Sequence, residues 1–111
     1  MARVNDDFYD LVHVPVLFVE GGPSDVAYKG GTLGYENISK LDVPVLWFSK
    51  EIGHGGDLFK PDGGDFTKII LAWLNWWLKG DETATGKGLL LGSDCPYCSD
   101  SAWEVKSANV P

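Results

Sequence analysis

The sequence of 111 residues is poor in basic side chains: nine lysines and arginines face sixteen aspartates and glutamates, for a formal net charge of -7 at pH 7. A chain with this balance lacks the basic surface with which proteins bind phosphate backbones. No apolar run reaches the roughly 18 residues that a membrane-spanning helix needs, and the N-terminus lacks the layout of a secretory signal. We therefore expect a soluble chain with no nucleic-acid partner and no membrane span.

Only two cysteines are present, Cys95 and Cys98, at the ends of a Cys-Pro-Tyr-Cys sequence. This spacing is compatible with redox exchange, with half of a metal site or with a local disulfide. A redox pair belongs at a helix N-terminus early in the fold, whereas this pair lies in a tail rich in Gly, Ser and Asp. A zinc site needs four ligands, and the only histidines, His13 and His54, are distant in the sequence. We favour a local disulfide, which suits proteins outside the cytoplasm.

Two short apolar runs, each beginning Val-Pro-Val, predict strands buried on both faces over residues 14–19 and 43–48. The connection between them is long enough for the crossover that a parallel pair requires. It contains Gly30 and Gly31, which we expect to break it into one helical turn before them and a second at residues 35–40. The two runs predict neighbouring parallel strands.

The clearest helix is predicted over residues 66–79, with Asp65 as its N-cap and Gly80 as its C-terminal stop. Its apolar residues mark one face and then spread around the cylinder: Phe66, Ile69, Ile70, Trp73, Leu74 and Trp77, with Leu71, Trp76 and Leu78 beyond them. Two strands and one helix cannot cover that much apolar surface. The sequence thus predicts a single partial α/β domain. Its core is expected over residues 1–80, and an irregular tail over 81–111 could add one edge strand.

Chemically useful residues follow both predicted strands. Asp25 comes after the glycines that end the first strand, and His54 lies in the Gly-His-Gly-Gly sequence after the second. The carboxyl ends of parallel strands share one edge of a sheet, where active sites form. There an imidazole can take a proton from a nucleophile while a carboxylate fixes its tautomer. Acid followed by histidine is the order of a hydrolase triad, so Asp25 is the candidate orienting acid and His54 the candidate base.

Both residues also have purely structural interpretations. Asp25 at a strand exit can cap a helical turn, and a histidine among glycines can be a solvated loop residue. His13, just before the first strand, is expected to be structural or exposed. The position of His54 one strand after Asp25 favours the catalytic interpretation.

Four sequences together resemble one region of a known family. They are Gly-Gly-Pro-Ser-Asp-Val-Ala-Tyr at 21–28, Gly-His-Gly-Gly at 53–56, Trp-Leu-Asn-Trp-Trp-Leu-Lys-Gly-Asp at 73–81 and Cys-Pro-Tyr-Cys at 95–98. This combination, over nearly the whole chain, is similar to the C-terminal portion of secreted α/β-hydrolases related to lipases, chlorophyllases and polyester hydrolases. The resemblance implies Asp25 as triad acid, His54 as triad histidine and a structural disulfide in the tail. It also implies a small-molecule or polymeric ester substrate, no metal or organic cofactor, and an extracellular parent protein.

The nucleophile of that family, the serine of Gly-x-Ser-x-Gly, has no counterpart in this sequence. The resemblance places it, with the oxyanion loop, upstream of residue 1. Ser24 directly precedes Asp25 and is not an elbow serine. The prediction is a carboxylic-ester hydrolase segment that supplies acid and histidine, is nearly inactive alone, and either self-associates, with strands completing one another's sheets, or pairs with a missing N-terminal half.

Three alternatives fit parts of the sequence. Gly-His-Gly-Gly also resembles an oxyanion loop, but that function needs an elbow serine downstream, and none is there. Tryptophans suggest a carbohydrate-binding or interaction module, although three of the five are predicted to pack on one helix. Glycoside hydrolysis by two carboxylates is the main enzymatic alternative, since acids follow both strands: Glu20, Asp25, Glu51 and Asp57.

Overall fold

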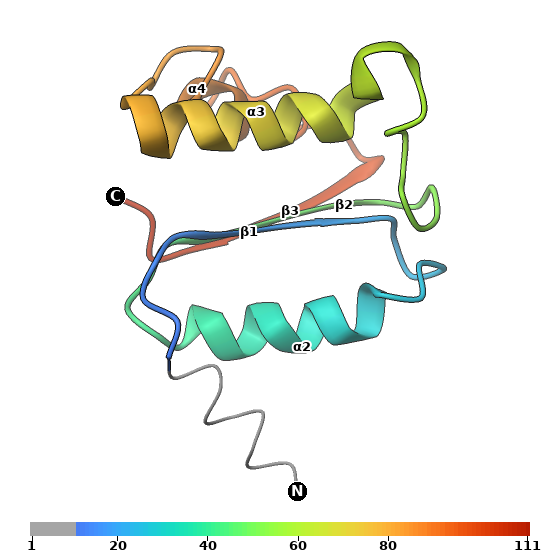
Figure 1. The fold of residues 1–111 in the computed structure, drawn as a ribbon, viewed down its shortest axis with the longest axis horizontal. Helices are drawn as coiled ribbons and strands as arrows, with labels where there is room; N and C mark the ends of the chain where they lie inside the picture. Colours follow the sequence, from blue (N-terminus) through green and yellow to red (C-terminus); the bar gives the residue numbers. More distant parts are fainter. Residues whose placement is uncertain (1–10) are drawn as a thin grey trace, which may run out of the picture.

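The structure is a computed structural model that describes residues 11–111, so the first ten residues of the expected domain lie outside it. One three-stranded sheet lies between two helical layers, with α2 (Tyr28–Ser39) on one face and α3 (Gly64–Lys79) on the other (Figure 1). A single turn, α4 (Lys87–Leu90), packs beside α3. The mixed α/β content predicted from the sequence is confirmed.

The first two strands, β1 (Val16–Glu20) and β2 (Val45–Lys50), pair in parallel as predicted. Each begins two residues later than its apolar run, after a proline that has no N–H to donate to a sheet. Pro44 still contributes an acceptor, since its carbonyl accepts a hydrogen bond of 3.0 Å from the Val16 backbone N–H.

Only β2 is a fully buried strand. Its residues Val45 to Phe48 have no exposed surface, whereas four of the five residues of β1 are only partly buried. The expectation that both strands are buried on two faces is therefore wrong for β1. The strand order β1-β2-β3 places β1 at the edge of the sheet, where the described residues pair with it on one side only.

The third strand, β3 (Trp103–Ala108), comes from the segment expected to be an irregular tail. It runs antiparallel to β2 and occupies the other edge of the sheet. The segment also adds four buried residues to the core beneath α3: Leu90, Cys95, Tyr97 and Trp103. The core of the described chain therefore depends on residues beyond 80.

The crossover is one continuous helix, α2, so the expectation of two turns broken by Gly30 and Gly31 is wrong. Burial of Tyr35 and Ile38 against β2 outweighs the cost of roughly 1 kcal/mol that each glycine adds to a helix. Gly31 also has a packing reason, because a Cβ at this position would overlap the carboxylate of Glu20.

Helix α3 ends as predicted but begins differently. Gly80 has the left-handed conformation, with φ of 69°, that stops the helix. The N-cap position belongs to Gly63 and not to Asp65, which lies inside the first turn. The capping side chain is Asp57, which accepts hydrogen bonds from the backbone N–H groups of Asp65 at 2.7 Å and Phe66 at 3.0 Å.

The buried face of α3 also differs from the expected one. Phe66, Ile69, Ala72, Trp73 and Trp76 are buried, and the tryptophans pack against one another instead of forming an exposed sugar platform. Ile70 and Leu74 of the predicted face are exposed, at 37% and 43%, as is Leu78 beyond that face, at 77%. Ile70, Leu74 and Leu78 form an exposed apolar stripe on α3, and no described residue covers it.

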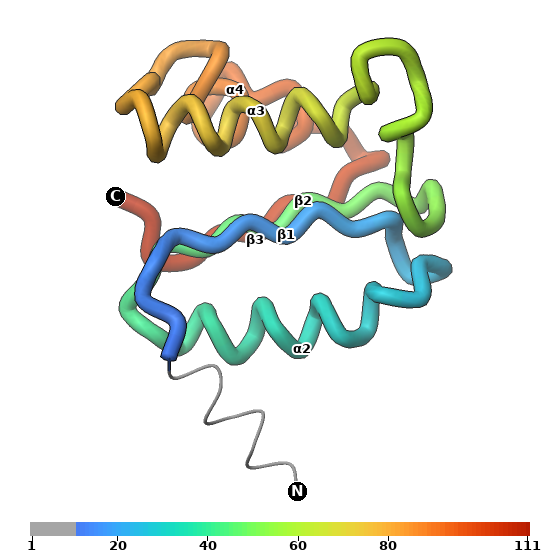
Figure 2. Tube along the Cα trace, in the orientation of Figure 1, coloured from blue at the N-terminus to red at the C-terminus, as the bar shows by residue number. Residues whose placement is uncertain are grey.

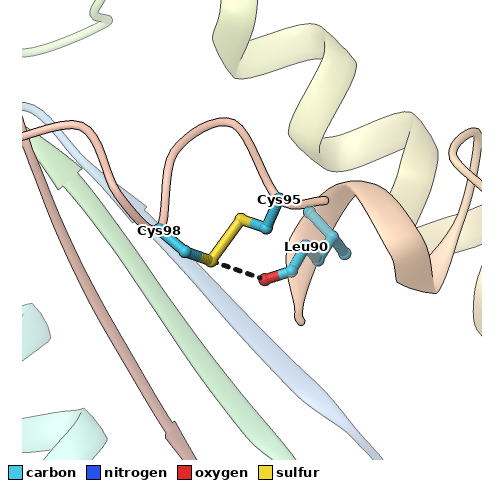
Figure 3. Close-up of a disulfide and its surroundings, with 3 residues drawn as sticks. All are labelled: Leu90, Cys95 and Cys98. Atoms are coloured by element: carbon cyan, nitrogen blue, oxygen red, sulfur yellow. Dashed lines mark hydrogen bonds between the residues drawn. A yellow bond between two sulfur atoms is a disulfide. The ribbon is translucent and has the colours of Figure 1, made fainter. Parts of the chain in front are cut away.

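The predicted local disulfide is present between Cys95 and Cys98, whose Cα atoms are 5.4 Å apart. The Cys98 sulfur contacts the Leu90 carbonyl oxygen at 3.5 Å, which brings the turn against the end of α4 (Figure 3). Between the cysteines, Tyr97 packs on Phe48 and Trp103 in the core. The disulfide therefore fixes a turn that leads the chain into β3.

None of the helices in residues 11–111 is long and apolar enough to span a membrane.

Candidate functional site

The loops that follow β1 and β2 leave the same end of the sheet and are joined to each other (Figure 2). The backbone N–H groups of Ile52 and Gly53 donate to the Gly21 carbonyl at 2.9 and 2.8 Å. The loops approach so closely that a Cβ on Gly21 would overlap the carbonyl of Gly53. The glycines of both loops therefore allow an acid from one and a histidine from the other to meet.

Asp25 lies at the first of these loops and is fixed by the backbone. Its Oδ2 accepts from the Gly21 N–H at 2.9 Å, and its Oδ1 accepts from the Ala27 N–H at 2.9 Å. Only 7% of the residue is exposed. The Ala27 hydrogen bond, followed by those from Gly21 and His54, holds the pKa of Asp25 below its usual value against the opposing effect of burial. Asp25 is thus a preorganised carboxylate.

His54 lies at the second loop, and its Nδ1 is 2.7 Å from Oδ1 of Asp25. An ionised carboxylate has no proton to donate, so Asp25 accepts the hydrogen bond and Nδ1 of His54 donates it. The neutral imidazole therefore carries its proton on Nδ1. The other ring nitrogen, Nε2, is then free to take a proton. The side chain of His54 is 70% exposed, whereas that of Asp25 is 5% exposed. The arrangement is a buried carboxylate bound to an accessible imidazole, a geometry in which an acid can orient a base.

Glu20 is a second buried acid at this end of the sheet. It is the last residue of β1, is 8% exposed and lines one cavity together with Asp25 and His54. Burial, followed by repulsion from Asp25, raises the pKa of Glu20, while His54 acts in the opposite direction. The sequence indicated Glu20 only as one of several strand-end carboxylates.

The cavity beside His54 has a volume of about 360 Å³. Its walls combine the three ionisable groups with a mainly apolar set from β1, the loops and α3: Val19, Ala27, Leu58, Phe66 and Ile70. An apolar hollow with a few converging polar groups is the usual form of a small-molecule site.

The other two strand-end acids have different contacts. Glu51 accepts a hydrogen bond of 2.6 Å from the Ser24 hydroxyl and another from the Ser24 backbone N–H. These bonds join the two loops. Asp57 uses both carboxylate oxygens to cap α3. Neither acid lines the cavity beside His54. The four acids named from the sequence therefore do not form one cluster.

No nucleophile is joined to His54 within residues 11–111. The Ser24 hydroxyl donates to Glu51, and no described hydroxyl or thiol hydrogen-bonds to the imidazole. His13, the other histidine, is exposed and contacts the Leu11 carbonyl oxygen through Nδ1 at 2.9 Å. Within the same range, no group of three or more His, Cys, Asp or Glu side chains is placed to hold a metal ion.

Comparisons with protein-family models, with curated proteins and with solved structures found no match for this chain.

Proposed function

We propose that this chain supplies the acid and the base of a serine-type carboxylic-ester hydrolase, with Asp25 as acid and His54 as base. The observation that supports the proposal is the 2.7 Å contact between His54 Nδ1 and Asp25 Oδ1 at the ends of adjacent parallel strands. The two backbone hydrogen bonds to Asp25 fix the carboxylate before any substrate binds. Preorganisation of this kind is what separates a catalytic pair from a solvated ion pair.

In the proposed reaction, a serine hydroxyl outside the described residues gives its proton to His54 Nε2 as its oxygen attacks the ester carbonyl. Asp25 stabilises the imidazolium that results and stays ionised, in keeping with its lowered pKa. The imidazolium then returns the proton to the departing alcohol, leaving an acyl-enzyme. Water, activated by the same imidazole, hydrolyses that ester and restores the serine.

Three further features fit the proposed class. The sequences around Asp25 and His54 resemble secreted hydrolases of the lipase, chlorophyllase and polyester-hydrolase group, which act on small or polymeric esters. The disulfide between Cys95 and Cys98 suits a parent protein that acts outside the cytoplasm. The apolar part of the cavity suits the acyl portion of an ester.

The test is hydrolysis of p-nitrophenyl acetate by the purified chain. Without its serine the pair can still act as a base towards water, so we expect slow hydrolysis without a burst of acyl-enzyme. His54→Ala should lower the rate about tenfold, which is less than the roughly hundredfold or more that a general base contributes in a complete site. Asp25→Ala should also lower it. His13→Ala is the matched control, because it removes the other imidazole and leaves the pair intact.

Equal rates for the wild type and His54→Ala would contradict the proposal. Cleavage of a p-nitrophenyl glycoside that survives His54→Ala and is lost in Glu20→Gln would instead favour the two-carboxylate alternative.

A further inference from the structure

A second pocket lies near the same end of the sheet as the Asp25–His54 pair, but beside the first residue of α2. Its volume is about 260 Å³, and it shares no lining residue with the cavity beside His54. Three of its residues have acceptor side chains and come from different segments: Ser49 from β2, Glu51 from the loop after β2 and Glu104 from β3. The pocket therefore gathers two acids and a hydroxyl outside the candidate catalytic site.

Each of the two acids is held through one carboxylate oxygen. Oε1 of Glu104 accepts from Nε1 of Trp47 at 2.9 Å and from the Tyr28 hydroxyl at 3.2 Å. Oε1 of Glu51 accepts from the hydroxyl and the backbone N–H of Ser24 at 2.6 and 3.2 Å. Within residues 11–111, neither Oε2 atom accepts a hydrogen bond and neither acid forms an ion pair. Both carboxylates are thus fixed in place, each with one oxygen free to bind a ligand.

Ser49 adds a buried hydroxyl to this pocket. It lies opposite Glu104 in the register of β2 and β3. Its side chain points to the α2 face, because side chains alternate along β2 and those of Val45 and Trp47 pack there. Only 3% of Ser49 is exposed, and its hydroxyl forms no hydrogen bond with the described residues. Buried polar side chains normally have a partner, which a donor in the pocket would supply.

We propose that this pocket binds a small organic cation through a primary ammonium group. An ammonium has a positive charge and three N–H donors. The pocket offers it the Oε2 atoms of Glu51 and Glu104 and the hydroxyl of Ser49. The lysine on the same face, Lys106, lies over the Trp47 ring at 4.5 Å and forms no ion pair with either acid. The two negative charges are therefore left for a cation from solution.

A divalent metal fits the pocket less well. Calcium takes roughly six to eight oxygen ligands, and magnesium requires octahedral geometry. No group of three or more His, Cys, Asp or Glu side chains in residues 11–111 is placed to hold a metal ion. The inference also does not depend on the proposed hydrolase, because no residue of this pocket belongs to the Asp25–His54 pair or lines its cavity.

The experiment is an NMR titration of the 15N-labelled chain with n-butylammonium chloride. The indole N–H of Trp47 donates to Glu104 and therefore reports on the pocket. The indoles of Trp73 and Trp76, in the core on the α3 side, are internal controls. We expect a saturable shift of the Trp47 signal and no shift of the controls. Tetramethylammonium chloride has the same charge without an N–H donor, and it should give no saturable shift.

Four variants assign the binding. Glu51→Gln and Glu104→Gln each keep an oxygen for the internal donors and should raise the Kd about two- to fivefold, the usual effect of an exposed ion pair. Ser49→Ala should raise it about tenfold, the effect of a hydrogen bond to a charged group. Glu82→Gln is the matched control, because Glu82 is exposed after the end of α3 and lies outside the pocket, and it should bind as the wild type does.

The wild type alone can overturn the proposal, even if no variant folds. It is wrong if the Trp47 signal does not saturate with n-butylammonium, or if tetramethylammonium shifts it equally. It is also wrong if calcium chloride at the same ionic strength produces the Trp47 shift and blocks n-butylammonium, since the pocket would then be a metal site. Affinities that stay unchanged in both Ser49→Ala and Glu104→Gln would place the binding elsewhere.

Discussion

The Phe66 backbone N–H donates a hydrogen bond of 3.0 Å to Oδ1 of Asp57, which joins the loop that contains His54 to the beginning of α3. The second oxygen of Asp57 accepts from Asp65 at 2.7 Å. Asp57 lies three residues after His54, so the helix start and the candidate base share one short segment. The stability of the loop and that of α3 are therefore linked.

Asp57→Ala should destabilise the fold by about 1–2 kcal/mol at neutral pH, the usual cost of a lost helix cap. Burial opposes ionisation of Asp57, but the hydrogen bonds from Phe66 and Asp65 outweigh it and lower its pKa. A lowered folded pKa means that the contribution is complete above the unfolded value of about 3.9 and is lost as the pH falls through the folded value. The cost of Asp57→Ala should therefore shrink below about pH 4.

Urea unfolding followed by tryptophan fluorescence measures this cost. Asp94→Ala is the control, because Asp94 is exposed and its side chain forms no hydrogen bond with residues 11–111. Equal costs for Asp57→Ala at low and neutral pH would contradict the account of the cap.

The glycines after His54 differ in their surroundings. Gly55 and Gly56 both have positive φ values, 85° and 54°, so alanine is strained at either position. A Cβ at Gly55 meets nothing within 4 Å, whereas one at Gly56 would overlap the Phe66 ring. Gly55→Ala should cost about 1 kcal/mol from strain alone, and Gly56→Ala about 1–3 kcal/mol more. The free energies of unfolding of these two variants measure the difference. Equal values would show that Phe66 does not restrict this loop.

The tautomer of His54 is a direct test of the pair. Because Asp25 accepts from Nδ1, the neutral ring should carry its proton there, and 15N chemical shifts report which nitrogen is protonated. Asp25→Asn can present an amide donor to Nδ1 and should move the proton to Nε2. His13 supplies the reference for an exposed ring in the same spectrum. An unchanged tautomer in Asp25→Asn would show that Asp25 does not orient His54.

Self-association stays a prediction, and the exposed apolar stripe of α3 is the surface on which we test it. Ile70 lines the same cavity as Val19 of β1, and Leu74 lies one turn further along the same helix. A partner that covers these residues would remove apolar surface from water. Leu74→Lys should therefore lower the average mass measured by light scattering at high concentration. Leu33→Lys is the control, since Leu33 is similarly exposed, at 52%, on α2. A wild-type chain that stays monomeric over the whole concentration range would refute the prediction.

Several elements could be predicted from local sequence because their causes are local. The two Val-Pro-Val runs gave parallel neighbours, and Gly80 ended α3 in the left-handed conformation. The Cys-Pro-Tyr-Cys spacing allowed three kinds of site, and its place in a tail rich in Gly, Ser and Asp favoured the disulfide that the structure contains. The positions of Asp25 and His54 after consecutive strands predicted that they lie close together, and the structure joins them at 2.7 Å. Strand ends meet at one edge of a parallel sheet whatever the rest of the fold does.

Other features depended on contacts between distant residues. The glycines of α2 predicted a break, but burial of Tyr35 and Ile38 against the sheet kept one helix. Asp65 had the better local position for an N-cap, yet Asp57 reached the helix start from the preceding loop. Edge strand β3 was only weakly indicated, because its pairing with β2 spans more than fifty residues of chain.

By itself, the sequence determined which residue types follow each strand, and therefore which acid and which base the site can use. Only the tertiary structure decided which carboxylates share the cavity with His54. Glu20 and Asp25 line it, whereas Glu51 and Asp57 are bound to Ser24 and to α3. The physical reason is that a carboxylate binds the hydrogen-bond donors that the fold brings within reach. The donors to Glu51 come from the loop after β1, and those to Asp57 come from the first turn of α3.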